Sequence, residues 1–141
     1  MFRWSLSTDL NSTASHLAIL ILRIGIAVLL LTHGIPKLVM IVTGNIHFPD
    51  PLGMGSVLSL VLSTFAETIC VIFIFLGLGT RLAAIPPIID LSVAAFIQHG
   101  ADPIAIKEKA LLYLLIFVVL LFAGAGRFSF DHKLHNRRFK R

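Results

Sequence analysis

The chain has 141 residues, of which 57% are hydrophobic and only 13% are charged, and its mean hydropathy is +0.93. This composition excludes an ordinary soluble domain, in which roughly 25% of residues are charged, and it also excludes a disordered chain. The net charge of +5 lies entirely in residues 127–141, because residues 1–126 carry six basic and six acidic residues. Cys70 is the only cysteine, which excludes an intramolecular disulfide and a Cys-X-X-Cys redox pair.

Four apolar segments follow one another along the chain, each close to the roughly 20 residues that a membrane-spanning helix needs. The predicted helices span about 17–42, 56–78, 82–99 and 103–126. Because the connections between them are short, successive helices should be antiparallel neighbours. The sequence therefore predicts an all-α fold, namely a transmembrane four-helix up-down-up-down bundle.

The distribution of Lys and Arg orients this bundle. The N-terminal segment 1–16, the turn at Arg81 and the tail 127–141 share one side and hold eight basic residues, whereas the other side holds three. Basic residues favour the cytoplasmic side, so both termini are predicted to be cytoplasmic and 17–126 to form the membrane domain. The basic, Phe-containing tail should bind anionic lipid headgroups, and no nucleic-acid partner is expected.

Three charged residues inside the predicted helices should meet one another. Counted from the cytoplasmic helix ends, Arg23, Asp90 and Glu67 lie roughly 9, 12 and 16 Å deep. Charges at such depths are costly and usually face the bundle interior. We therefore expect an inner layer in which Arg23 pairs with the two acids, and because one cation faces two acids, one of them is expected to be protonated.

A second set of polar residues should form an outer layer near the opposite interface. At depths of roughly 24–30 Å lie His33, Lys37, Gln98 and Glu108, with His99 beside them. Lys37 is expected to extend toward the interface. Two histidines without a third ligand at suitable spacing do not predict a metal site, so hydrogen bonding or proton transfer is the expected role of His33 and His99.

Helical phase, at about 100° per residue, sorts these side chains onto faces. One face of the second predicted helix carries Ser59, Ser63, Glu67 and Cys70. One face of the third carries Pro86, Asp90, Ala94 and Gln98. His99 lies opposite Asp90 unless the backbone breaks at His99-Gly100, and Pro86-Pro87 should kink this helix or end its first turn.

Several short motifs resemble those of the DoxX family. They are Leu22-Arg23-Ile24-Gly25, His33-Gly34-Ile35-Pro36-Lys37, Glu67, Gly77-Leu78-Gly79-Thr80-Arg81, His99-Gly100, Lys107-Glu108-Lys109-Ala110-Leu111-Leu112-Tyr113 and Gly124-Ala125-Gly126-Arg127-Phe128-Ser129. The resemblance covers roughly residues 17–131. It implies a small four-helix integral membrane protein of the bacterial cytoplasmic (inner) membrane, and it implies an association with membrane-bound oxidoreductase complexes that use quinones.

The leading hypothesis is a membrane subunit of an oxidoreductase complex that binds a quinone-like lipophile between its helices. Arg23, Glu67 and Asp90 would form a charged layer beneath the pocket. His33, His99 and Tyr113 would hydrogen-bond the head group or exchange protons with it, with Lys37 and Glu108 nearby. The expected partner is another protein, which would supply electrons, or a second copy of this chain in a homo-oligomer.

Two other readings stay open at this point. In the first, the protein is a structural or assembly subunit without a ligand, and the sole role of the charged layer is to hold the helices together. Alternatively, a weak repeat of two helical hairpins is compatible with a transporter of a small solute or protons. Whether the protein is catalytic is left open.

Overall fold

The computed structural model describes residues 12–138, and every regular element among them is a helix. The elements are α2 (Ser12–Thr43), α3 (Ser56–Thr64), η1 (Phe65–Ile69), α4 (Cys70–Leu76), α5 (Thr80–Ala83), α6 (Ile85–Ser92), η2 (Val93–Gln98), α7 (Ile104–Ala123) and α8 (Phe130–Arg138). The predicted all-α class is confirmed for this part of the chain. Residues 1–11 of the predicted N-terminal segment and residues 139–141 of the predicted tail lie outside the described residues.

Three helical stretches are long and apolar enough to cross a membrane: α2, then α3 to α4, and then α5 to η2. The fourth long helix, α7, has 20 residues, and the charged Lys107, Glu108 and Lys109 lie in its first two turns. Large apolar side chains such as Leu82 and Phe122 are exposed on the outside of these helices. An apolar exterior around internally hydrogen-bonded backbone suits a lipid bilayer.

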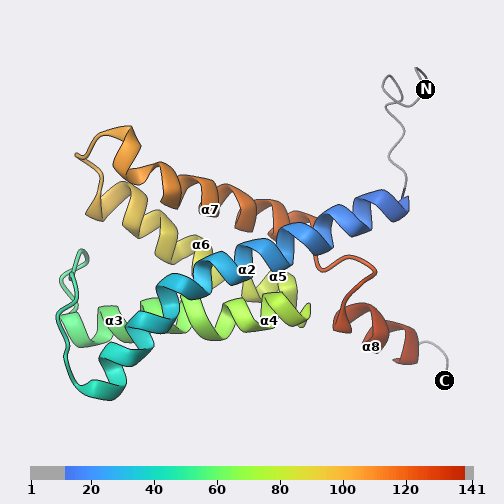
Figure 1. Ribbon diagram of the computed structural model, residues 1–141, viewed down its shortest axis with the longest axis horizontal. Coiled ribbons are helices and arrows are strands. Elements are labelled where there is room, and N and C mark those ends of the chain that lie inside the picture. The colour runs from blue at the N-terminus through green and yellow to red at the C-terminus, as the bar shows by residue number, and fades with distance from the viewer. Residues whose placement is uncertain (1–11, 139–141) are drawn as a thin grey trace.

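The connecting loops gather at two ends of the molecule. Figure 1 shows the loop between α2 and α3 and the loop between η2 and α7 at one end, with the start of α2 and α8 at the other. α2 crosses α3 and α4 obliquely and also contacts α7, while α6 packs along α7. We refer to the end that holds α8 as the tail end and to the other as the loop end.

The apolar core occupies the region where α2, α4, α6 and α7 meet. Its fully buried side chains include Leu30 on α2, Ile74 on α4, and Phe117 and Leu120 on α7. Between helices in lipid, such close packing stabilises mainly through van der Waals contacts. Buried polar side chains lie outside this apolar core, in two separate clusters.

Two features interrupt the regular helices. α5 ends at Ala83, and Pro86 and Pro87 occupy the first turn of α6, as expected for residues that cannot donate a backbone N–H. Short π-helical stretches, η1 and η2, interrupt the second and third long helices. π-Helical turns occur frequently at functional sites. Here η1 carries Glu67, and η2 ends at Gln98.

Candidate functional site

A cavity of about 300 Å³ lies toward the loop end, between α2, the loop of residues 44–55, α3–η1 and α6–η2. Its polar lining residues are Lys37, Ser59, Ser63, Glu67, Asp90 and Gln98. Its apolar lining residues are Phe48, Pro51, Leu52, Met54, Leu62, Phe65, Ala66, Pro86, Ile89, Val93 and Ala94. The cavity thus combines apolar walls with charged groups from three helices.

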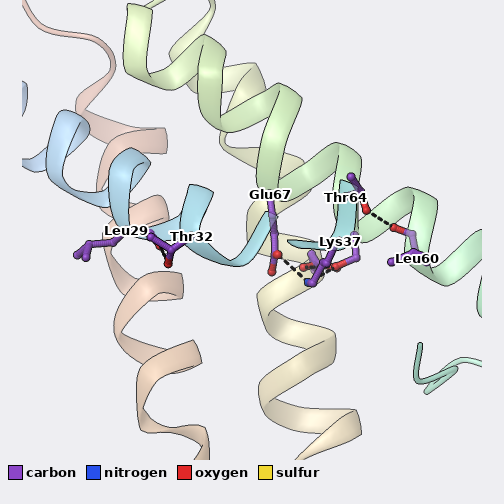
Figure 2. A network of polar contacts seen from close by, with 8 residues as sticks. Leu29, Thr32, Lys37, Leu60, Thr64 and Glu67 are labelled. Atoms are coloured by element: carbon purple, nitrogen blue, oxygen red, sulfur yellow. Dashed lines mark hydrogen bonds and ion pairs between the residues drawn. The ribbon is translucent and has the colours of Figure 1, made fainter. Parts of the chain in front are cut away.

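An ion pair forms the polar floor of the cavity. Lys37 Nζ lies 2.6 Å from Glu67 Oε2 and donates a hydrogen bond of 2.7 Å to Ser63 Oγ. Ser63 Oγ in turn donates to Asp90 Oδ2 over 3.1 Å. Figure 2 shows Lys37 reaching from α2 to Glu67. Glu67 is only 5% exposed, so the pair is held largely away from solvent.

A close approach of two backbones brings the ion pair together. Gly34 on α2 packs directly on η1: a Cβ at this position would lie 2.5 Å from the carbonyl oxygen of Glu67 and 2.6 Å from Thr68 Oγ1. Lys37 follows Gly34 by three residues and therefore lies on the same side of α2. Glycine at position 34 thus permits the contact that places Lys37 beside Glu67.

The loop between α2 and α3 closes the end of the cavity, and Asp50 fixes its shape. The Asp50 carboxylate accepts hydrogen bonds from the backbone N–H of Gly55 (2.7 Å) and Met54 (3.0 Å) and from Ser59 Oγ (2.8 Å). These bonds, led by that from Gly55, lower the pKa of Asp50, because they stabilise its ionised form. Phe48 of this loop lies over the ammonium group of Lys37, with 5.3 Å between the nitrogen and the ring centroid.

The expectation for Lys37 is wrong. Its side chain does not extend to the interface but is 20% exposed and bound to Glu67 and Ser63. A carboxylate buried inside the helices needs a cation, and Lys37 is the one that reaches it.

The predicted inner layer of Arg23, Glu67 and Asp90 is also wrong. Arg23, which is 2% exposed, donates from Nη1 to the carbonyl oxygen of Ala125 (2.5 Å) and from Nη2 to that of Phe128 (2.8 Å). These carbonyls follow the end of α7, so Arg23 belongs to a cluster at the tail end and not to the cavity.

The depth count failed because its origin was misplaced. α2 begins at Ser12 and runs beyond the ends of the other helices (Figure 1), so Arg23 lies level with Gly77 at the end of α4. From that level, Lys37 is 14 residues along α2, or roughly 21 Å, and Glu67 is 10 residues back along its helix, or roughly 15 Å.

The other predicted site residues lie outside the cavity. His33 is exposed and meets the ring of Tyr113 edge-on, with 6.1 Å between the ring centroids. The helix does end before His99, but the imidazole Nδ1 lies 2.7 Å from Asp102 Oδ2 in the following turn. Glu108 is exposed near the start of α7. The structure therefore brings Lys37, Glu67 and Asp90 together, and it does not add His33, His99, Glu108 or Tyr113 to them.

Helical phase predicted the parts of the cavity that two helix faces contribute. Ser59, Ser63 and Glu67 of one predicted face line it, and so do all four members of the other face: Pro86, Asp90, Ala94 and Gln98. The contributions of Phe48 and of the loop were missed, because no periodic pattern connects a loop to a helix face. Within the described residues, no group of three His, Cys, Asp or Glu side chains is placed to hold a metal ion.

Comparisons with known proteins show the family of the chain. The family model described as DoxX matches residues 18–100. An uncharacterized protein of Haemophilus influenzae is 32% identical over 127 residues, covering 82% of this chain and 90% of that protein. No solved structure matches the chain. The match to the family model and the similarity to this relative show that the chain belongs to the DoxX family.

Proposed function

We propose that this protein is a membrane subunit that binds a quinone-like lipophile, or another lipophile with a polar head group, in the cavity at the loop end. The observation that carries the proposal is the combination of apolar walls with the ionic floor of Lys37, Glu67 and Asp90. Ligand sites for small molecules are typically apolar cavities with a few polar groups that fix orientation. A volume of about 300 Å³ is suited to a single aromatic head group.

The position of the cavity supports access from the lipid. Leu62, Phe65 and Ile89 line the cavity and are also about half exposed on the outer surface of the helices. A lipophile could therefore enter sideways between α3–η1 and α6, with its tail remaining in the bilayer. Membrane helices whose charged groups face a cavity are functional sites by default.

The proposal extends to the setting of the protein. The helices form an up-down-up-down bundle in a bacterial cytoplasmic membrane, with both termini in the cytoplasm. The basic tail binds anionic lipid headgroups there. We further propose that a protein partner donates the electrons for any reduction of a bound quinone.

Binding of a short-tailed quinone to the full chain in nanodiscs tests the proposal. We expect saturable binding above that of empty nanodiscs, and we expect Glu67→Gln to weaken it by roughly 10–100-fold, because the ion pair that orders the floor is lost. His33→Ala is the matched control, since His33 is polar and intramembrane but does not line the cavity. Absence of saturable binding, or equal affinities for the wild type and Glu67→Gln, would refute the proposal.

A structural role is the second candidate, because Lys37 is bound within the protein to both Glu67 and Ser63. The charge-swapped pair Lys37→Glu with Glu67→Lys separates the two roles. A purely structural ion pair should tolerate the swap, with thermal stability and partner capture retained. A ligand site should lose its affinity in the swapped protein even though the protein folds.

A further inference from the structure

The hydrogen-bond donors on the cavity floor are already used within the protein. Lys37 Nζ contacts Glu67 and Ser63, and its remaining side faces the ring of Phe48. An ammonium group has three donors and no acceptor. One donor of Lys37 is bonded to Ser63, and the ion pair with Glu67 engages the side that faces the carboxylate. Ser63 Oγ donates its one proton in a hydrogen bond to Asp90 Oδ2.

The remaining serine of the cavity is committed in the same way, since Ser59 Oγ donates to Asp50 Oδ1. Gln98 at the rim is exposed and carries both a donor and an acceptor, so it does not favour either kind of ligand. The two serine hydroxyl groups of the cavity therefore donate within the protein, and the ammonium group of Lys37 is engaged by Glu67 and Ser63.

Acceptors, by contrast, are left over. Ser63 Oγ contacts Asp90 Oδ2, Lys37 Nζ contacts Glu67 Oε2, and a hydrogen bond joins the two carboxyl groups. A carboxylate has about four acceptor positions, so several positions of the pair stay open to a ligand. Asp90 also lies close enough to Glu67 to act on it directly, so two acids share the single cation Lys37. A proton held between the two acids would be used inside the pair and would add no donor for a ligand.

We propose that the cavity selects a lipophile whose head group donates a hydrogen bond, such as a hydroquinone, over the corresponding acceptor-only quinone, and that Asp90 is the acceptor that determines this preference. This inference rests on the proposed function. A quinone carbonyl would meet carboxylate oxygens and would leave them unpaired in an apolar site, which is costly. A hydroxyl group would satisfy one of them. A site built to hydrogen-bond a substrate hydroxyl discriminates strongly against an analogue that lacks it.

Three probes with the same short alkyl tail test the preference without any mutation: a benzoquinone, its hydroquinone and the dimethyl ether of that hydroquinone. Binding to the full chain in nanodiscs is measured anaerobically by calorimetry, with empty nanodiscs subtracted. We expect the hydroquinone to bind about tenfold or more tightly than either of the others, as for one charge-assisted hydrogen bond. The ether controls for ring size and electron-rich character.

The role of Asp90 is tested by Asp90→Asn, which adds an N–H donor at the same position. The preference for the hydroquinone should fall to about threefold or less. Asp102→Asn is the matched control, because Asp102 binds His99 in a turn outside the cavity, and it should keep the full preference.

The outcomes separate this inference from the proposed function. If all three probes bind saturably with similar affinity, or the quinone binds best, the donor preference is refuted while the lipophile site stands. If none binds above empty nanodiscs, both fall. If Asp90→Asn folds and keeps the full preference, Asp90 is not the selecting acceptor.

Discussion

Two cations on α2 bind different kinds of acceptor: Arg23 binds backbone carbonyls and Lys37 binds a carboxylate. The chemistry of the two side chains explains the difference. Arg23 lies at the tail end and donates from two nitrogens to the carbonyls of Ala125 and Phe128. A planar guanidinium can bridge two acceptors at once, which an ammonium cannot do with the same geometry. Lys37 lies toward the loop end and forms a compact ion pair with Glu67. Arg23 therefore joins α2 to the segment that follows α7, whereas Lys37 places a positive charge at the cavity.

Gly34 provides a prediction at the scale of one residue. Gly34→Ala should lower the free energy of unfolding by about 1–3 kcal/mol, because its Cβ would overlap the backbone carbonyl of Glu67, which cannot move aside as a side chain could. The measurement is thermal or denaturant unfolding in detergent, followed by circular dichroism.

Gly25 on the same helix is the matched control for Gly34. A Cβ there would meet nothing within 4 Å, so Gly25→Ala should be neutral or should stabilise the helix by up to about 1 kcal/mol. An equal loss of stability in both variants would mean that the close packing at Gly34 is unimportant. A loss confined to Gly34→Ala would support the account of how the ion pair is positioned.

At the scale of elements, the tail-end cluster joins α2, α4, α5, α7 and α8. Asp131 at the start of α8 accepts hydrogen bonds from the backbone N–H of Gly79 (2.8 Å) and Thr80 (3.3 Å), and its own N–H donates to the carbonyl of Gly77 (3.0 Å). Gly77 has φ +72°, and a Cβ there would collide with the guanidinium of Arg23. The glycine-rich ends of the second and fourth long helices thus form a docking site for α8.

Arg23→Lys should loosen this cluster. The lysine could reach only one of the two carbonyls well, so we expect a loss of about 1.5–3 kcal/mol, as for one hydrogen bond to a charged group. Limited proteolysis should then cut near α8 at lower protease concentration, and the unfolding temperature should fall. Arg127→Lys is the control, since Arg127 is exposed. Unchanged protection of α8 in Arg23→Lys would contradict the role given to the guanidinium.

The helices and their faces were predictable from the sequence, but the pairing between helices was not. The apolar segments predicted all the long helices, because spanning a bilayer requires long apolar stretches. Helical phase predicted the faces that carry Glu67 and Asp90, because phase is a local property of each helix. The partner of Glu67 was not predictable in this way. Pairing across helices depends on their relative height and crossing angle. Neither the start of α2 at Ser12 nor its oblique course can be deduced from the sequence of one helix alone.

At the scale of the whole molecule, the Arg23 cluster and the cavity lie at opposite ends. Most basic residues of the chain belong to the segments at the end that holds the Arg23 cluster. The Arg23 cluster lies at the tail end with α8, whose sequence is rich in basic residues, while the cavity lies toward the loop end. The positive-inside rule predicts that the tail end lies in the cytoplasm. The proposed cavity then lies toward the opposite leaflet, so a head group would be reached from that side.

Cysteine labelling in spheroplasts tests this orientation. In a Cys70→Ser background, Asn45→Cys lies in the exposed loop after α2, and Asn136→Cys lies on the exposed side of α8. A membrane-impermeant maleimide should label Asn45→Cys in intact spheroplasts and Asn136→Cys only after the membrane is permeabilised. The reverse pattern would contradict the charge argument and would move the cavity to the cytoplasmic leaflet. The lipophile proposal would survive that reversal, because it depends on the lining of the cavity, but any partner that exchanges electrons with the ligand would then have to approach from the cytoplasm.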